Sequence, residues 1–193
     1  MTEFQGFPKI ARLSRPMIVT EKIDGTNGCI YIGEDGEFLV GSRTRWITPE
    51  ADNHGFASWA HEHKDELITL GPGRHFGEWW GHGIQRGYGL KGGDKRFSLF
   101  NTTRWCLHDG IPRMASATKP QQALPPCVGL VPVLYEGSFS LVMVDIHLDR
   151  LIKQGSEAAP GFMNPEGVVV YHSAGNVCFK KTIKNDDAPK GAS

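Results

Sequence analysis

The chain has 193 residues with 21 basic and 21 acidic side chains, so its formal net charge is zero. A chain of this length can bury about 70 % of its unfolded surface in one domain. The balanced charge gives no overall basic field that would attract nucleic acid, so any anion-binding site must be a local cluster. The N-terminus lacks a signal-peptide pattern, and no apolar run reaches the ~18 residues of a membrane span. We therefore expect a soluble, cytoplasmic protein without membrane attachment, in a single domain 1–193.

Most of the chain consists of short strand-like runs bounded by turn residues. In order these runs are 17–22, 28–33, 37–42, 74–80, 96–101, 103–108, 166–172 and 176–182. Turn residues at 34–36 and 173–176 are typical of hairpins. Apolar side chains recur with helical spacing from Phe56 to Leu67 and from Leu141 to Ile152. The pattern predicts an α+β fold of mainly antiparallel sheets with flanking helices.

Two segments are expected to lack regular structure. Residues 110–133 contain five prolines, which favours an ordered but irregular connection. The tail 185–193 is expected to fray.

Cysteine and histidine residues do not indicate a metal site. Cys29, Cys106, Cys127 and Cys178 are far apart, form no CxxC pair and lie in or near apolar runs. This is more typical of buried free thiols in a reducing compartment than of disulfides or metal ligands. The run His61-Glu62-His63 favours an exposed helix surface, because residues two apart on a helix point in different directions.

The run TEKIDGTNGCIYI, residues 20–32, ends a strand at Lys22, two residues before Asp24-Gly25. Taken alone it is a hairpin with a lysine at its edge. Further charged residues then occur within or beside apolar strands, namely Arg43, Glu78, Glu166, Lys180 and Lys181. Because such charges are costly to bury unpaired, we expect these strands to line a polar cleft.

This order of residues resembles the covalent nucleotidyltransferase superfamily of ATP-dependent ligases and capping enzymes, and within it the small phage-type ATP-dependent RNA ligases. The resemblance covers residues 17–182 and implies an ATP-grasp-like nucleotidyltransferase domain with a nucleotide cleft. It implies ATP as substrate, Mg²⁺ or Mn²⁺ as cofactor, Lys22 as the group that bonds to AMP, and Glu166 as the metal ligand. Nucleotide contacts are assigned to Glu21, Asn27, Arg43, Glu78, Phe100, Lys180 and Lys181.

Two site assignments leave more than one candidate residue: the lysine that contacts phosphate and the aromatic residue that stacks on the base. The family usually has two lysines separated by one residue late in the domain, whereas Lys180 and Lys181 are adjacent and Lys184 follows. Neighbouring strand residues point to opposite faces, so only one of the first two can face the cleft, and Lys180 is favoured. The aromatic side chain that stacks on the base is Phe100 or Phe97.

In the implied reaction, the lysine amine attacks the α-phosphorus of ATP and pyrophosphate leaves. A free lysine has a pKa of about 10.4, so the neutral amine is scarce at pH 7. Partial burial and a nearby cation would favour the neutral amine, whereas the charge of Asp24 opposes it. Asp24 is therefore expected to shape the turn or to act later on a 3′-hydroxyl. Arg43 and Lys180 would neutralise phosphates, and Glu78 would accept hydrogen bonds from ribose.

The resemblance also implies RNA partners with 5′-phosphate and 3′-hydroxyl ends, with DNA left open. Basic residues interleaved with aromatic ones suit a nucleic-acid groove, although a solvated surface explains them equally well. They are Arg45, Arg74, Arg86, Lys91, Lys95 and Arg96, with Trp46, Trp80 and Tyr88. The glycine-rich run 83–95 is expected to be a mobile loop near the site.

Length favours an RNA ligase, because the residues after Lys181 are too few for the OB-fold domain of capping enzymes and DNA ligases. The pattern identifies no protein partner. Two alternatives remain open. The first is a nucleotidyltransferase that modifies a protein or a small molecule, and the second is a non-catalytic nucleotide- or nucleic-acid-binding module.

Overall fold

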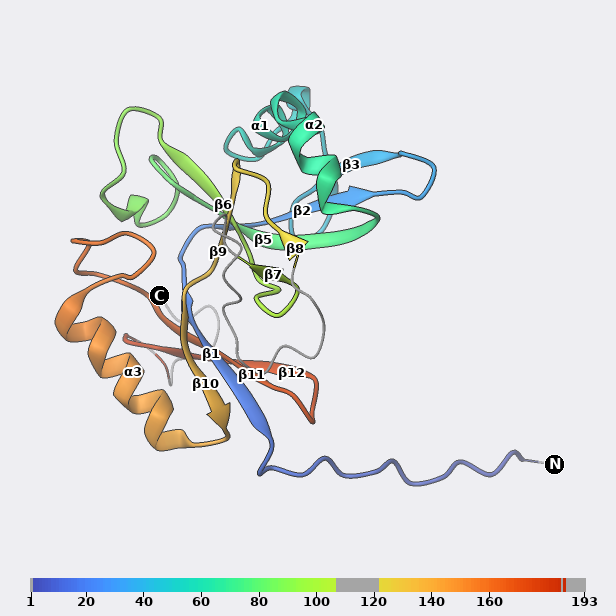
Figure 1. The fold of residues 1–193 in the computed structure, drawn as a ribbon, viewed down its shortest axis with the longest axis vertical. Helices are drawn as coiled ribbons and strands as arrows, with labels where there is room; N and C mark the ends of the chain where they lie inside the picture. The colour runs from blue at the N-terminus through green and yellow to red at the C-terminus, as the bar shows by residue number, and fades with distance from the viewer. Residues whose placement is uncertain (1, 107–121, 185, 187–193) are drawn as a thin grey trace.

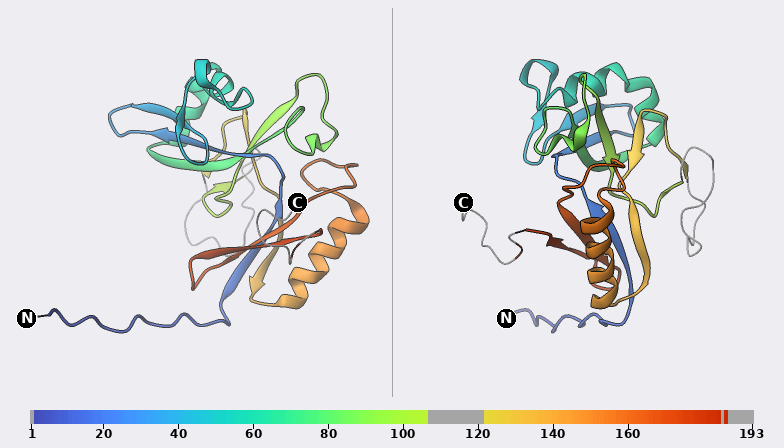
Figure 2. Two further views of the ribbon diagram at one scale, coloured as in Figure 1. Left: turned by 180° about the vertical axis from the view of Figure 1, so that it is seen from behind. Right: turned by 90° about the vertical axis from the view of Figure 1, so that its left-hand side faces the viewer.

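The computed structural model describes residues 2–106, 122–184 and 186. These residues form two main β-sheets, one above the other in Figure 1, with short helices on the upper sheet and one long helix beside the lower sheet. Residues 2–12 run away from both sheets as an exposed extension (Figure 2). The predicted α+β fold with mainly antiparallel sheets is confirmed.

The upper sheet has six strands in the order β4-β3-β2-β5-β6-β9. Their bounds are β2 Thr26–Ile32, β3 Phe38–Gly41, β4 Trp46–Ile47, β5 Gly73–Gly81, β6 Lys95–Leu99 and β9 Val128–Leu130. Neighbours are antiparallel except β6 and β9, which are parallel. The hairpin predicted at 34–36 is confirmed, because it joins the paired strands β2 and β3.

One face of this sheet packs on short helical segments, with bounds η1 Pro49–Ala51, α1 Phe56–Glu62, α2 Lys64–Leu67 and η2 Ile68–Leu70. The ring of Phe56 lies 4.8 Å from Phe97 and 5.4 Å from Trp79, centroid to centroid, and all three side chains are buried. The helix expected from Phe56 to Leu67 is interrupted, because His63 has φ −99° and ψ 17°.

The lower sheet has four antiparallel strands in the order β10-β1-β11-β12. Their bounds are β1 Pro16–Lys22, β10 Val133–Ser138, β11 Gly167–His172 and β12 Val177–Thr182. Residues 173–176 connect β11 to β12, as the sequence predicts.

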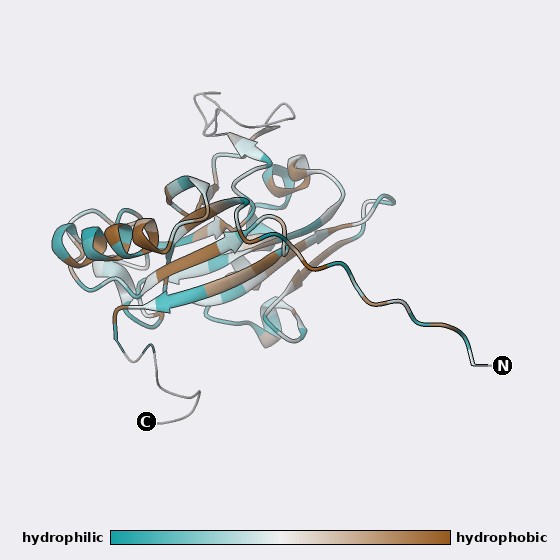
Figure 3. Ribbon diagram, turned by 90° about the horizontal axis from the view of Figure 1, so that it is seen from below, coloured by the Kyte–Doolittle hydropathy of each residue, from teal (hydrophilic) through white to brown (hydrophobic). Residues whose placement is uncertain are grey.

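Helix α3 (Leu141–Gln154) covers one face of this sheet and buries Val144, Leu148 and Leu151. In Figure 3 brown apolar and teal polar residues alternate along this helix. Leu141 and Ile152, which the helical spacing placed in the buried stripe, are 67 % and 47 % exposed. The stripe of buried side chains on α3 is therefore narrower than the apolar stripe predicted from the sequence.

Strands β1 and β2 do not pair with each other, so the hairpin suggested by residues 20–32 is absent. Strand β1 belongs to the lower sheet and β2 to the upper one. Residues 23–25 carry the chain from one sheet to the other, which places Lys22 where the two sheets meet.

The remaining elements are short: η3 is Gly87–Gly89, and β7 (Trp105–Cys106) pairs in parallel with β8 (Gln122–Ala123). The expected irregular connection 110–133 thus contains β8 and β9 in its described part, and the rest lies outside the described residues. Apart from Asp186, the tail expected to fray also lies outside them. Among the described residues, no helix is long and apolar enough to cross a membrane.

Candidate active site

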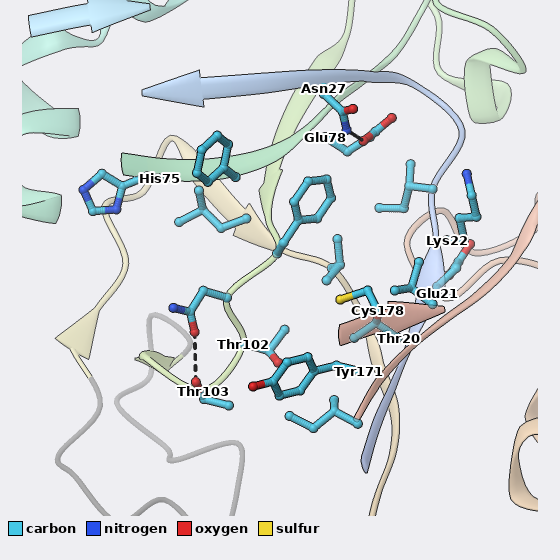
Figure 4. Close-up of a pocket in the computed structure, with 18 of the residues that line it drawn as sticks. Thr20, Glu21, Lys22, Asn27, His75, Glu78, Thr102, Thr103, Tyr171 and Cys178 are labelled. Carbon is cyan, nitrogen blue, oxygen red and sulfur yellow. Dashed lines mark hydrogen bonds between the residues drawn. The ribbon is translucent and has the colours of Figure 1, made fainter. Parts of the chain in front are cut away.

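A cleft of about 860 Å³ lies between the two sheets and is walled by side chains from both. Figure 4 shows Lys22 and Glu21 on β1, with Asn27 and Glu78 across the cleft. Seven of the residues predicted for the catalytic and nucleotide-binding site line it: Glu21, Lys22, Asn27, Arg43, Glu78, Phe100 and Lys180. Asp24, Glu166 and Lys181 are not part of its lining.

Lys22 and Glu166 form an ion pair, with 2.5 Å between the lysine Nζ and the carboxylate Oε2. Antiparallel pairing of β1 with β11 sets Lys22 opposite Gly167, which brings the preceding Glu166 beside the amine. Both side chains are largely shielded, at 24 % and 16 % exposure. A Cβ at Gly167, where φ is 155°, would lie 2.2 Å from the carbonyl oxygen of Lys181, so this position requires glycine.

Glu78 holds the turn that follows Lys22. Its Oε1 accepts a hydrogen bond from the Gly25 amide and its Oε2 accepts one from Asn27 Nδ2, each at 3.0 Å. Pairing of β2 with β5 places Asn27 opposite Glu78. Burial raises the pKa of Glu78 from 4.5 to about 7, although the two hydrogen bonds and the charge of Lys22 oppose this shift.

The raised pKa of Glu78 predicts a pH-dependent stability. The folded protein keeps this proton at pH values where the unfolded chain has lost it, so the free energy of unfolding falls as pH rises from about 4.5 to about 7. Glu78→Gln should flatten that dependence by about 2–3 kcal/mol, measured by urea unfolding at pH 5 and pH 8. Glu34→Gln, on the exposed β2–β3 connection, is the control. Parallel profiles for wild type and Glu78→Gln would contradict the shift.

Glu21 and Asp24 flank Lys22 but their carboxylates are bound by other parts of the protein. Glu21 is 1 % exposed. It accepts hydrogen bonds from Ser156 Oγ at 2.6 Å and from the amides of Glu157 and Ala158 at 2.8 and 2.9 Å. Asp24 Oδ2 accepts a hydrogen bond from Arg86 Nε at 2.8 Å. The Glu21 carboxylate thus anchors the segment after α3, and a nucleotide contact by it stays a prediction.

The two adjacent lysines of β12 point to opposite sides, as strand geometry requires. Lys180 lines the cleft together with Cys178 of the same strand. Lys181 instead pairs with Asp145 of α3, with 2.5 Å between its Nζ and the aspartate Oδ1. The structure therefore does not bring Lys181 into the cleft.

The two aromatic candidates differ in burial. Phe97 is 1 % exposed and packs in the core of the upper sheet, whereas Phe100 is 42 % exposed and lines the cleft. Phe76, which sequence reasoning missed, is 54 % exposed in the same cleft, and its carbonyl accepts the Phe100 amide at 3.0 Å. Strand alternation could have found it, since Phe76 and Arg74 share a β5 face with Glu78.

Much of the predicted nucleic-acid groove is engaged within the protein. Trp80 and Tyr88 are 2 % exposed, so they cannot stack on bases as the sequence suggested. Arg86 pairs with Asp24, and Arg96 pairs with Asp94 at 3.0 Å. Arg74 lines the cleft and lies over the rings of Tyr31 and Trp46.

Three cysteines have described side chains, and all three are free thiols, as predicted. Cys29 is buried and Cys127 is intermediate, but Cys178 is exposed, contrary to expectation. Cys127, His63 and Glu66 bring three potential ligand atoms within 4.8 Å of one another. His63 Nδ1 lies 3.0 Å from Glu66 Oε1, so hydrogen bonding accounts for this contact without an ion.

Comparison with known proteins identifies the family of the chain. A family model described as RNA ligase matches residues 15–184, and the chain belongs to this family. None of the curated proteins compared with the chain matches it.

The solved structures that resemble the chain include several variants of Naegleria gruberi RNA ligase. One variant, solved with ATP and Mn, has a TM-score of 0.57, 20 % sequence identity, and coverage of 89 % of this chain and 51 % of the other. Another, solved with AMP and Mn, has a TM-score of 0.53, 19 % identity, and coverage of 88 % and 50 %. The two proteins share a fold, and the chain spans about half the length of these solved relatives.

Proposed function

We propose that this chain is the nucleotidyltransferase domain of an ATP-dependent RNA ligase, and that Lys22 carries AMP in its covalent intermediate. The observation that carries the proposal is the position of Lys22, where the sheets meet, beside Glu166 and across the cleft from Glu78. Membership of the RNA ligase family supports RNA as the substrate class. The likeness to ligase structures that contain ATP or AMP with Mn supports the nucleotide.

The first step forms a bond between Lys22 Nζ and the α-phosphorus of ATP and breaks the bond to the β-phosphate oxygen, so that pyrophosphate leaves. The amine attacks in its neutral form, because only that form has a lone pair, and the protons that the nitrogen loses as the phosphoramidate forms pass to solvent. Glu166 orients the amine through the ion pair. Arg43 and Lys180, both exposed in the cleft, would stabilise the charge that develops on the leaving pyrophosphate.

Glu166 fits a divalent cation, because Mg²⁺ prefers carboxylate oxygens together with phosphate oxygens and water. When bound, the cation supplies positive charge that neutralises phosphate and favours the neutral amine. Glu78 would position the nucleoside by accepting from ribose hydroxyls, and Phe100 would stack on the base.

The assay that tests this function follows both AMP and the RNA strand. Wild-type protein incubated with ATP labelled at the α-phosphate and Mg²⁺ should gain the mass of AMP, and the label should stay on the protein after the protein is denatured. Added 5′-phosphorylated RNA should then become capped with AMP and joined to a 3′-hydroxyl, with DNA strands run in parallel. An adduct without any strand capping or joining would refute the ligase assignment and leave an acceptor of another kind. Absence of an adduct would refute the catalytic assignment altogether.

The opposite orientations of Lys180 and Lys181 predict opposite results for two alanine variants. Lys180→Ala should slow formation of the AMP adduct on the order of 10-fold or more, because one phosphate-neutralising charge is lost. Lys181→Ala breaks only the exposed pair with Asp145 and should leave the rate near that of wild type. Single-turnover labelling at saturating ATP measures both. If Lys181→Ala formed the adduct slowly and Lys180→Ala formed it at the wild-type rate, Lys181 and not Lys180 would be the phosphate contact.

The two phenylalanines give a second matched pair. Phe100→Ala should raise the ATP concentration for half-maximal labelling on the order of 10-fold, as expected for losing ~1–3 kcal/mol of stacking, with little change in stability. Phe97→Ala removes a fully buried ring and should cost about 3–5 kcal/mol of stability. Urea unfolding and ATP titration separate the two effects. A strongly destabilised Phe100→Ala would mean that this ring is structural.

A further inference from the structure

We infer that Arg86 is a positioning residue for the lysine nucleophile. Its guanidinium joins the turn after Lys22 to the segment that carries Glu166. Nε donates to Asp24 Oδ2 at 2.8 Å, and Nη1 donates to the carbonyls of Asn164 at 3.1 Å and Pro165 at 3.2 Å. Asp24 lies two residues after Lys22, and Pro165 directly precedes Glu166. One side chain thus binds both the turn that follows Lys22 and the two residues that precede Glu166.

The segment that presents Arg86 is held firmly, which a positioning role requires. Ile84 is fully buried and Tyr88 is 2 % exposed. The Tyr88 ring packs 5.2 Å from Trp80 and 4.6 Å from Phe162, centroid to centroid. The sequence suggested that the glycine-rich run 83–95 is a mobile loop. Its residues 84–88 are instead anchored by the buried side chains of Ile84 and Tyr88.

Tyr88 adds a second link to the same turn. Its hydroxyl oxygen accepts a hydrogen bond from the Asp24 amide at 2.8 Å. The backbone of Tyr88 has φ 49° and ψ 26°, a left-handed conformation that is uncommon for a residue with a side chain and persists where surrounding contacts enforce it. The backbone and the carboxylate of Asp24 are thus both bound by residues 86–88.

These contacts indicate that Asp24 and Arg86 together fix the turn that follows Lys22. Both side chains are about one-quarter exposed, and the carboxylate is held by the guanidinium rather than directed into the cleft lining. Asp24 therefore acts by fixing the turn, which was one of the two roles open from its sequence. Arg86 was also a candidate RNA contact, but its Nε and Nη1 donate to partners within the protein.

The inference rests on the proposed function and predicts a specific kinetic effect. Arg86→Gln should slow the single-turnover rate of Lys22 adenylylation on the order of 10–100-fold, because small misplacements of a reacting group are costly. The ATP concentration for half-maximal rate should change little, since Arg86 is outside the cleft lining. Arg86→Lys should recover part of the rate, because it keeps the charge but cannot form the fork of bonds.

A double-mutant cycle tests whether Arg86 acts through Asp24. Asp24→Asn and Arg86→Gln should each slow adenylylation, and the double variant should be no slower than about the slower single variant. Arg150→Gln, which breaks the pair with Glu157 away from the cleft lining, is the matched control and should label normally. Thermal midpoints are recorded for every variant, and if Arg86→Gln does not fold, Asp24→Asn and Arg86→Lys carry the test.

Each outcome decides one question. If wild type forms no adduct, the proposed function fails. If wild type forms the adduct and folded Arg86→Gln does so equally fast, only the positioning role fails. Rate losses that multiply in the double variant, or an Asp24→Asn defect confined to sealing of pre-adenylylated RNA, would also overturn the inference.

Discussion

Lys22→Arg is expected to abolish the AMP adduct, with labelling reduced at least about 10³-fold, to background. Arginine keeps a positive charge that can pair with Glu166, so the environment of the ion pair is largely retained. Its guanidinium stays protonated at any pH at which the protein is folded, so it has no neutral amine to attack phosphorus. Labelling with α-phosphate-labelled ATP and intact-protein mass measure the result.

Lys22→Ala provides the complementary variant, since it removes both the nucleophile and the charge. Both variants should fold, because Lys22 is 24 % exposed and lies at the end of β1. Lys180 is another lysine in the cleft, so the labelled peptide from wild type should be sequenced by mass spectrometry. An adduct that survives Lys22→Ala, or one mapped to Lys180, would falsify the assignment of the nucleophile.

Glu166→Gln is expected to slow adenylylation on the order of 10²-fold and to raise the Mg²⁺ concentration for half-maximal rate. The amide retains the shape of the carboxylate but has neither its charge nor its affinity for a hard cation. The measurement is a Mg²⁺ titration of the single-turnover rate, repeated with Mn²⁺.

The change should leave the fold intact, because Glu166 is partly exposed and its partner is a lysine that water can also reach. Glu157→Gln, which removes the partner of Arg150, is a control for loss of an acidic side chain. A collapse of the thermal midpoint in Glu166→Gln would identify a structural acid, and an unchanged Mg²⁺ titration would rule out the proposed metal ligand.

The sequence was informative where a property depends on a residue and its immediate neighbours. Alternation along strands correctly predicted that Lys180 and Lys181 face opposite ways, and turn residues predicted the hairpins that join β2 to β3 and β11 to β12. Helical spacing located α3, although not how wide a stripe of it is buried.

Local patterns failed where a contact involves residues far apart in the chain. The Asp-Gly turn after Lys22 indicated a hairpin, whereas β1 and β2 belong to different sheets. Phe97 and Phe100 were indistinguishable by residue type, and one is in the core while the other lines the cleft. Trp80 and Tyr88 suited base stacking by composition but are covered by other parts of the chain.

The order of residues specifies which chemical groups the site has available: a lysine before an Asp-Gly turn, then Arg43, Glu78, Glu166 and Lys180. The folded chain adds that strand pairing sets Glu166 against Lys22, that Glu78 holds the turn, and that Arg86 joins the two segments. The physical reason is that periodicity reports which side of its own element a residue occupies. Its partner across the cleft depends on long-range strand pairing, which the local pattern does not record.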